Sequence, residues 1–261
     1  MRFRRVAAAA VVSGLVLLAG CGEPAATGGK GPEPGTVSGD ITVFAASSLT
    51  ESFTAIGKKF EKANPGANVT FNFGASSALA TQINDGAPAD VFVSAAPTNM
   101  QTVVDEGNAA GDPVVFVRNE LVIAVPKGNP KDVSGLDDLT KPGVKVALCA
   151  KQVPCGAAAQ QALKAGGVSV TPATYERDVK AALSKVKLGE VDAALVYRTD
   201  VKAAKPDVDG VEFPESAKAI NDYPIVALQD APNRAGARAF LTYVRSATGE
   251  DVLAAAGFQS P

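Results

Sequence analysis

Short apolar runs alternate with amphipathic segments along most of the chain. Residues 41–46, 69–73 and 90–94 are rich in Val, Ile and Phe, a composition typical of strands. Each run precedes a segment whose apolar residues recur three or four positions apart, as in a helix. The helices expected there span 49–63, 77–84 and 98–106. This order predicts a mostly parallel sheet with helices on its faces.

The same alternation restarts after the turn Gly111-Asp112-Pro113 and indicates a second α/β unit. The strands expected there span 114–117, 121–125, 144–148 and 193–197, and the helices span 157–164 and 178–187. A strand at 223–228 and helices at 233–246 and 249–256 follow. Periodicity alone does not assign this last part to either unit.

Serine pairs occupy two of the strand-to-helix junctions. Ser47 and Ser48 follow the first strand, and Ser76 and Ser77 follow the second. Open parallel sheets bind ligands beyond the carboxyl ends of their strands, where hydroxyls and helix-start N–H groups can hold an anion. Neither junction contains Lys, Arg or His. An anion there would therefore be bound by the dipoles of the helix start and not by a positively charged side chain. For each serine taken alone, the alternative is a plain helix N-cap.

The composition excludes several kinds of function. The chain has no His, which rules out a Ser-His-Asp hydrolase and a histidine-bound zinc. A Ser-Lys dyad stays open, but no Ser-x-x-Lys falls at a strand-to-helix turn. The formal net charge is −2, and no basic run follows the N-terminal arginines, so we expect no nucleic-acid partner. We predict a binding protein and not an enzyme.

The N-terminus has the pattern of an export signal. A basic start precedes an apolar run over 6–18, and Leu18-Ala19-Gly20-Cys21 resembles the lipobox of bacterial lipoproteins. That resemblance implies a signal peptide at 1–20 and an acylated Cys21 that anchors the chain on the extracytoplasmic face of the cell membrane. Residues 21–37, mainly Gly, Pro, Ala and acidic residues, are predicted to form a flexible tether. An ordinary signal peptide and a single-span anchor are the alternatives.

Five segments resemble, in order along the chain, the periplasmic molybdate-binding component of the ABC importer. They are 41–49, 74–77, 86–95, 153–156 and 194–197, and the likeness runs from Ile41 to Phe258. The resemblance implies the type II periplasmic binding protein fold, with two doubly wound α/β lobes and a ligand cleft between them. It places 38–118 and 223–261 in lobe I and 119–222 in lobe II.

The resemblance also implies which groups hold molybdate. These are hydroxyl and N–H donors at Ser48 and Ser76, backbone N–H groups at Cys155 and Val179, and the hydroxyl of Tyr197. Taken alone, Tyr197 would be a core aromatic with a satisfied hydroxyl, and Val179 a plain helix residue.

No carboxylate is expected among these groups. Such a shell suits a dianion that carries no proton, so we expect phosphate to be rejected and tungstate to bind like molybdate. The alternatives are a binding protein for sulfate, another oxyanion or an iron–anion complex, and an exported enzyme or sensor that uses the same clamshell.

Cys149 and Cys155 are predicted to form a disulfide, because export permits oxidation; two free thiols are the alternative. We expect no cofactor and no bare metal ion, since two cysteines without His cannot complete a tetrahedral shell. The partners implied by the resemblance are the molybdate ion and the membrane permease of an ABC importer. We expect a monomer, because one anion between two lobes needs no second subunit.

Overall fold

The computed structural model describes residues 37–261. The predicted signal peptide at 1–20, the acylated Cys21 and nearly all of the predicted tether therefore lie outside the described residues. Within 37–261, no helix combines the length and the apolar character that a membrane span requires.

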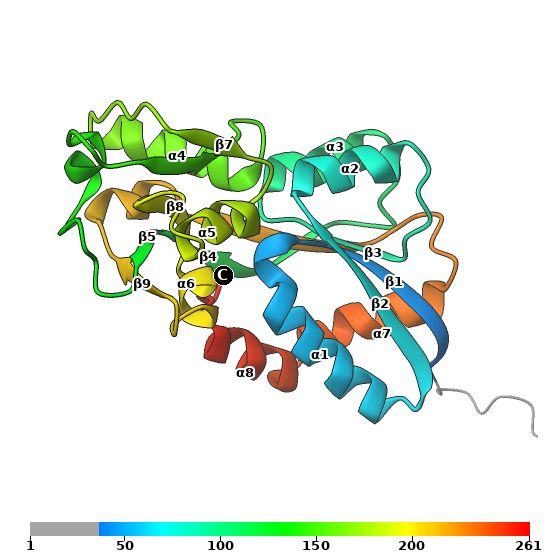
Figure 1. Ribbon diagram of the computed structural model, residues 1–261. Coiled ribbons are helices and arrows are strands. Elements are labelled where there is room, and N and C mark those ends of the chain that lie inside the picture. The colour runs from blue at the N-terminus through cyan, green and yellow to red at the C-terminus, as the bar shows by residue number, and fades with distance from the viewer. Residues whose placement is uncertain (1–36) are drawn as a thin grey trace, which may run out of the picture. The chain divides into compact units, whose positions relative to one another are not determined.

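The first sheet has five strands in the order β2-β1-β3-β10-β4, and its strands β1 and β2 are labelled side by side in Figure 1. Their bounds are β1 (Ser38–Ala46), β2 (Gly66–Gly74), β3 (Val91–Val93), β4 (Val114–Asn119) and β10 (Asn221–Ala227). Strand β1 pairs parallel with β2 and β3, whereas β10 is antiparallel to β3 and β4. The C-terminal part of the chain therefore returns to the first sheet, as the resemblance implies.

Helices cover both faces of this sheet. They are η1 (Ser47–Leu49), α1 (Thr50–Ala63), α2 (Ser76–Asn84), α3 (Pro97–Asp105), α7 (Arg234–Val244) and α8 (Ala247–Ala256). Alternate residues of β1 point to opposite faces. Val43 therefore packs in one core with Phe53 of α1 and Phe240 of α7, while Phe44 packs in another core with Leu79 of α2.

The second sheet has the order β7-β6-β8-β5-β9. Its strands are β5 (Leu121–Pro126), β6 (Val146–Cys149), β7 (Thr174–Glu176), β8 (Ala193–Tyr197) and β9 (Val208–Val211). The helices of this part are η2 (Leu136–Thr140), α4 (Pro154–Ala165), α5 (Val179–Lys187), α6 (Arg198–Ala203) and η3 (Pro214–Lys218). One apolar core joins them, and 121–125 of β5 are fully buried within it. The predicted pair of α/β lobes is confirmed, with one antiparallel strand in each sheet.

The two sheets are joined by neighbouring crossings. The chain leaves the first sheet at Asn119, enters the second at Leu121 and returns at Asn221, which pairs directly opposite Asn119. We propose the lobe boundaries given above, 38–118 with 223–261 and 119–222; the strand membership agrees with them except that Asn119, Asn221 and Asp222 pair in the first sheet. Both crossings lie next to buried polar side chains, which are described with the site below.

Candidate functional site

A small cavity lies where strand ends and helix starts from both lobes meet. Its volume is ≈ 10 Å³, counted as space for the centre of a water-sized sphere. The residues that line it are Ala46, Ser47, Ser48, Gly74, Ala75, Ser76, Ala95, Val153, Pro154, Cys155, Asp178, Val179 and Tyr197. The structure thus brings together all five residues that the resemblance implied as anion ligands, and their binding role stays a prediction.

Three α-helices begin at this cavity. Helix α2 starts at Ser76, α4 at Pro154 and α5 at Val179. The first-turn N–H groups of a helix have no carbonyl partner within the helix, and the helix dipole makes that end partly positive. Cys155 and Val179 stand in the first turns of α4 and α5, so their N–H groups are suited to an anion.

Neither serine pair supplies a helix cap, since α1 and α2 have no side-chain N-cap hydrogen bond. Ser48 Oγ instead lies 2.8 Å from Tyr223 Oη, and Ser76 Oγ accepts the Ala95 N–H at 2.9 Å. Both serines are buried. The N-cap alternative is therefore wrong for Ser48 and Ser76.

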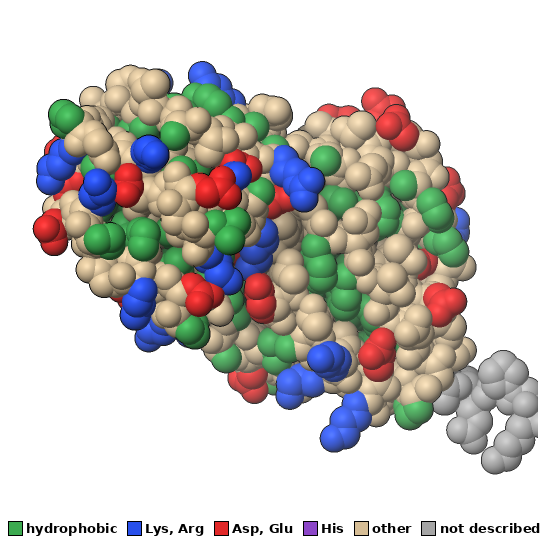
Figure 2. All heavy atoms as spheres, viewed as in Figure 1, with side chains coloured by type: hydrophobic (Ala, Val, Ile, Leu, Met, Phe, Trp, Pro, Cys, Tyr) green, Lys and Arg blue, Asp and Glu red, His purple; other side chains and the backbone are tan. Residues whose placement is uncertain are grey.

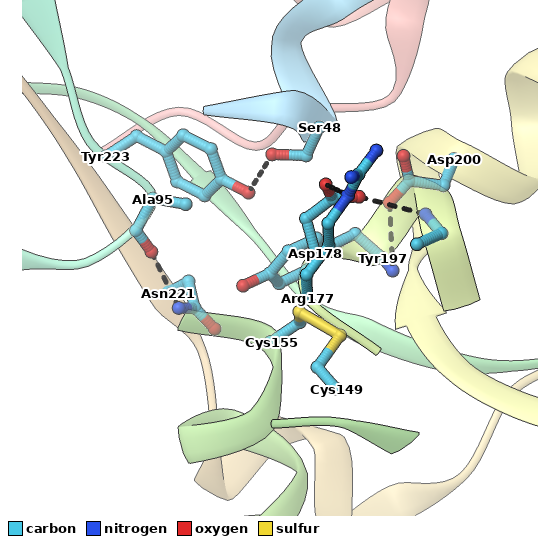
Figure 3. The surroundings of a disulfide bond; sticks show 11 residues. Ser48, Ala95, Cys149, Cys155, Arg177, Asp178, Tyr197, Asp200, Asn221 and Tyr223 are labelled. Carbon is cyan, nitrogen blue, oxygen red and sulfur yellow. Dashed lines mark hydrogen bonds and ion pairs between the residues drawn. A yellow bond between two sulfur atoms is a disulfide. The ribbon is translucent and has the colours of Figure 1, made fainter. Parts of the chain in front are cut away.

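Tyr197 ends β8 with its side chain fully buried. Its hydroxyl has no hydrogen-bond partner of acceptable geometry among the described residues, although its ring lies edge-on to that of Tyr223 (Figure 3). Burial raises the pKa of the Tyr197 phenol well above its ordinary value, and the nearby Tyr223 and Asp200 raise it further. The phenol is therefore neutral and has a hydrogen to donate. A core tyrosine with a satisfied hydroxyl, the alternative from sequence, is wrong.

One carboxylate does line the cavity, contrary to the expectation from sequence. Asp178 precedes α5, and its Oδ1 accepts the Ala181 N–H at 2.9 Å as a helix N-cap. Its Oδ2 lies 3.5 Å from the Nε of Arg177, whose side chain is exposed. The carboxylate is present because α5 needs a cap where it begins. No Lys or Arg belongs to the lining within the described part of the chain.

The disulfide between Cys149 and Cys155 lies beside the cavity (Figure 3), with an S–S distance of 2.10 Å and 5.8 Å between the Cα atoms. It ties the end of β6 to the first turn of α4, so it fixes the backbone that carries the Cys155 N–H. Gly156 adds to this constraint, because a Cβ there would lie 1.9 Å from the carbonyl oxygen of Ala150. The loop must therefore run close against the helix start.

Replacing Cys149 and Cys155 together with serine is expected to lower the free energy of unfolding by about 2 kcal/mol, the chain-entropy value for so short a loop. Anion affinity should fall as well, because the Cys155 N–H is then less firmly held. Urea unfolding and calorimetric titration measure the two effects. Wild-type affinity in this variant would mean that the bond serves stability alone.

Charged side chains are mixed on the surface. On the face shown in Figure 2, Lys and Arg are interspersed with Asp and Glu and do not gather into one basic patch. This surface gives no support for nucleic-acid binding, which depends on clustered positive charge.

The chain resembles known proteins over nearly its whole length. It matches the family described as bacterial extracellular solute-binding protein over residues 41–259. It is 42% identical over 253 residues to the molybdate-binding protein ModA of Mycobacterium tuberculosis H37Rv, an alignment covering 97% of this chain and 95% of the relative.

Two solved structures share the fold. The periplasmic molybdate-binding protein of Azotobacter vinelandii has a TM-score of 0.73 and 22% identity, covering 85% of this chain and 99% of the other. The sulfate-binding protein SubI of Mycobacterium tuberculosis H37Rv has a TM-score of 0.73 and 19% identity, covering 85% and 86%. At such identities these likenesses show the fold alone.

The resemblance found in the sequence is confirmed by the family match and by the 42% identical relative. The family is one of solute-binding proteins and not of enzymes. The chain belongs to the family of bacterial extracellular solute-binding proteins.

Proposed function

We propose that this chain captures molybdate between its two lobes outside the cytoplasm and delivers it to the permease of an ABC importer. The observation that carries the proposal is the interlobe cavity, where first-turn N–H groups of three α-helices meet the hydroxyls of Ser48, Ser76 and Tyr197. The similarity to the Mycobacterium tuberculosis ModA supports molybdate as the ion.

Molybdate is a tetrahedral dianion without a proton at neutral pH, so a shell made of donors satisfies it. Hydrogen phosphate also needs an acceptor, and the one carboxylate in the lining, Asp178, uses its Oδ1 to cap α5 through the Ala181 N–H and has Arg177 Nε 3.5 Å from its Oδ2. We therefore propose that phosphate is rejected and that tungstate, which has the shape and charge of molybdate, is accepted. Sulfate is the second candidate ligand, because it is also a dianion that needs only hydrogen-bond donors. It differs from molybdate in size.

The energy available from such a shell is sufficient for tight binding. Each hydrogen bond to a charged group contributes about 1.5–3 kcal/mol. Five donors or more can offset the desolvation of a dianion and still leave roughly −8 kcal/mol, which corresponds to a micromolar dissociation constant. Binding favours the closed arrangement, because only closure brings donors of both lobes within reach of one ion.

Calorimetric titration of the full chain with molybdate, tungstate, sulfate and phosphate tests the proposal. We expect one-to-one heat with molybdate and tungstate at micromolar affinity or tighter, and no heat with phosphate. Sulfate binding as tight as molybdate binding would favour the second candidate. Absence of heat with every oxyanion would refute an anion-binding role.

We further propose that Cys21 carries a lipid that keeps the protein at the cell membrane, and that the protein is a monomer. The support for the lipid is the Leu18-Ala19-Gly20-Cys21 sequence after an apolar segment. The support for the monomer is that both halves of the cavity come from one chain.

A further inference from the structure

We infer that Tyr223 fixes Ser48 as a hydrogen-bond donor toward the bound anion, so that Tyr223 is a specificity-determining positioning residue for anions that carry no proton. This inference rests on the proposed anion-binding function. Tyr223 does not belong to the cavity lining and belongs to none of the sequence motifs. It acts through the serine it contacts.

Tyr223 is held rigidly beneath the site. It lies near the start of β10, is fully buried, and packs edge-on against Tyr197 and Phe258 at ring distances of 6.1 and 5.5 Å. Its hydroxyl points to Ser48 (Figure 3), with 2.8 Å between the two oxygens. The ring cannot turn away without disturbing this packing, so the hydroxyl contact is a fixed feature.

Asn119 favours one direction for this hydrogen bond. The Asn119 Oδ1 accepts the N–H of Glu120 at 3.0 Å, which orients the amide. Its Nδ2 therefore faces Thr199 Oγ1 at 2.9 Å and Tyr223 Oη at 3.5 Å. An amide nitrogen can only donate, so the phenol oxygen accepts from Asn119, and we assign the phenol hydrogen to Ser48 Oγ, which lies 2.8 Å away.

Ser48 then has its own hydrogen left for the cavity. Ser76 is placed in the same state by a different route, because its Oγ accepts the backbone N–H of Ala95. With the unpartnered hydroxyl of Tyr197, the hydroxyls of Ser48, Ser76 and Tyr197 can all donate to the anion. The group that donates to Ser76 is a backbone N–H, whereas the group that donates to Ser48 is the side chain of Tyr223. Only the Tyr223 hydroxyl can be removed by substitution.

A serine hydroxyl released from this constraint can rotate and offer a lone pair instead. Loss of the Tyr223 hydroxyl should therefore weaken binding of proton-free anions and relax the rejection of anions that carry a proton. Chromate and hydrogen arsenate at pH 8 are suitable probes, because both are tetrahedral dianions of similar size and only the second carries a proton.

The test compares Tyr223→Phe with the wild-type full chain, using Tyr243→Phe as the control that removes a hydroxyl from α7. We expect Tyr223→Phe to lower molybdate affinity about tenfold and to narrow the chromate-to-arsenate affinity ratio by a similar factor. In a Ser48→Ala background the same substitution should leave that ratio unchanged. Tyr243→Phe should match the wild type.

A second variant guards against misfolding. Asn119→Leu keeps the Tyr223 side chain but removes the amide that donates to its hydroxyl. This variant should narrow the chromate-to-arsenate affinity ratio, as Tyr223→Phe does. An unchanged chromate-to-arsenate affinity ratio in folded Tyr223→Phe or Asn119→Leu would overturn the inference. So would an equal change of that ratio when Tyr223→Phe is made in the Ser48→Ala background. In either case, molybdate binding by the wild type would still support the proposed function. A wild type that bound none of the three anions would overturn both.

Discussion

Replacing both Ser48 and Ser76 with alanine is expected to weaken molybdate binding about 10²–10⁴-fold. Each substitution removes one hydroxyl donor to a charged ligand, at about 1.5–3 kcal/mol per hydrogen bond. Ser76 Oγ already accepts the Ala95 N–H, and we assign Ser48 Oγ as the acceptor from Tyr223, so both hydroxyls have a hydrogen for the ligand. Calorimetric titration with molybdate measures the loss directly.

The matched control is the double variant Ser52→Ala with Ser77→Ala. Ser52 stands on α1, which follows the η1 turn that carries Ser48, and Ser77 stands on α2 next to Ser76; neither lines the cavity. The control should bind molybdate like the wild type. Far-UV circular dichroism at the titration temperature checks that both double variants are folded, and wild-type affinity after loss of Ser48 and Ser76 would move the binding site elsewhere.

The sequence was sufficient to predict the helices and strands in which apolar residues recur with a clear periodicity. The helix expected at 49–63 is α1 at Thr50–Ala63, and the strand expected at 193–197 is β8 with those bounds. Two strands and one α-helix were missed, as were the five-residue helices η2 and η3. Strand β7 is three residues long at a sheet edge, β9 contains Asp209 and Gly210, and α6 has six residues directly after β8. Such short elements are fixed by tertiary contacts and not by local pattern.

The site was less accessible to sequence reasoning than the fold. The five lining residues entered through a family resemblance, and the serine junctions alone favoured N-caps. Tyr223 and Asn119 carried no local signal, because their partners lie far along the chain; Ser48 and Tyr223 are separated by 175 residues. Asp178 stood beside Val179 in the sequence and could have been recognised as the N-cap of the helix predicted to begin there.

An ion cluster around the buried Asp200 adjoins the site and connects the two lobes. Lys180 of α5 pairs with Glu51 of α1 at 2.7 Å and with Asp200 of α6 at 2.9 Å. The second contact is an ion pair without a well-aligned hydrogen bond. Asp200 is fully buried, and burial raises its pKa although Lys180 opposes the shift. Glu51 is half exposed. The lysine therefore compensates a carboxylate that has no access to water.

Replacing Lys180 with methionine is expected to lower the free energy of unfolding by about 3–5 kcal/mol at pH 8, because it leaves the Asp200 charge buried without a partner. The loss should be smaller at pH 5. Without Lys180 the folded-state pKa of Asp200 rises further above its unfolded value of about 3.9, so the folded state holds the extra proton and stability falls as the pH increases. Urea unfolding at both pH values measures this.

Two further variants separate the buried charge from the contact between lobes. Adding Asp200→Asn to Lys180→Met removes both charges and should recover most of the stability. Glu51→Gln breaks only the exposed contact to the other lobe and should cost less than about 1 kcal/mol. A Lys180→Met chain with the same loss at pH 5 and pH 8 would contradict the role given to Asp200, because only a titrating buried carboxylate makes the deficit depend on pH in this range.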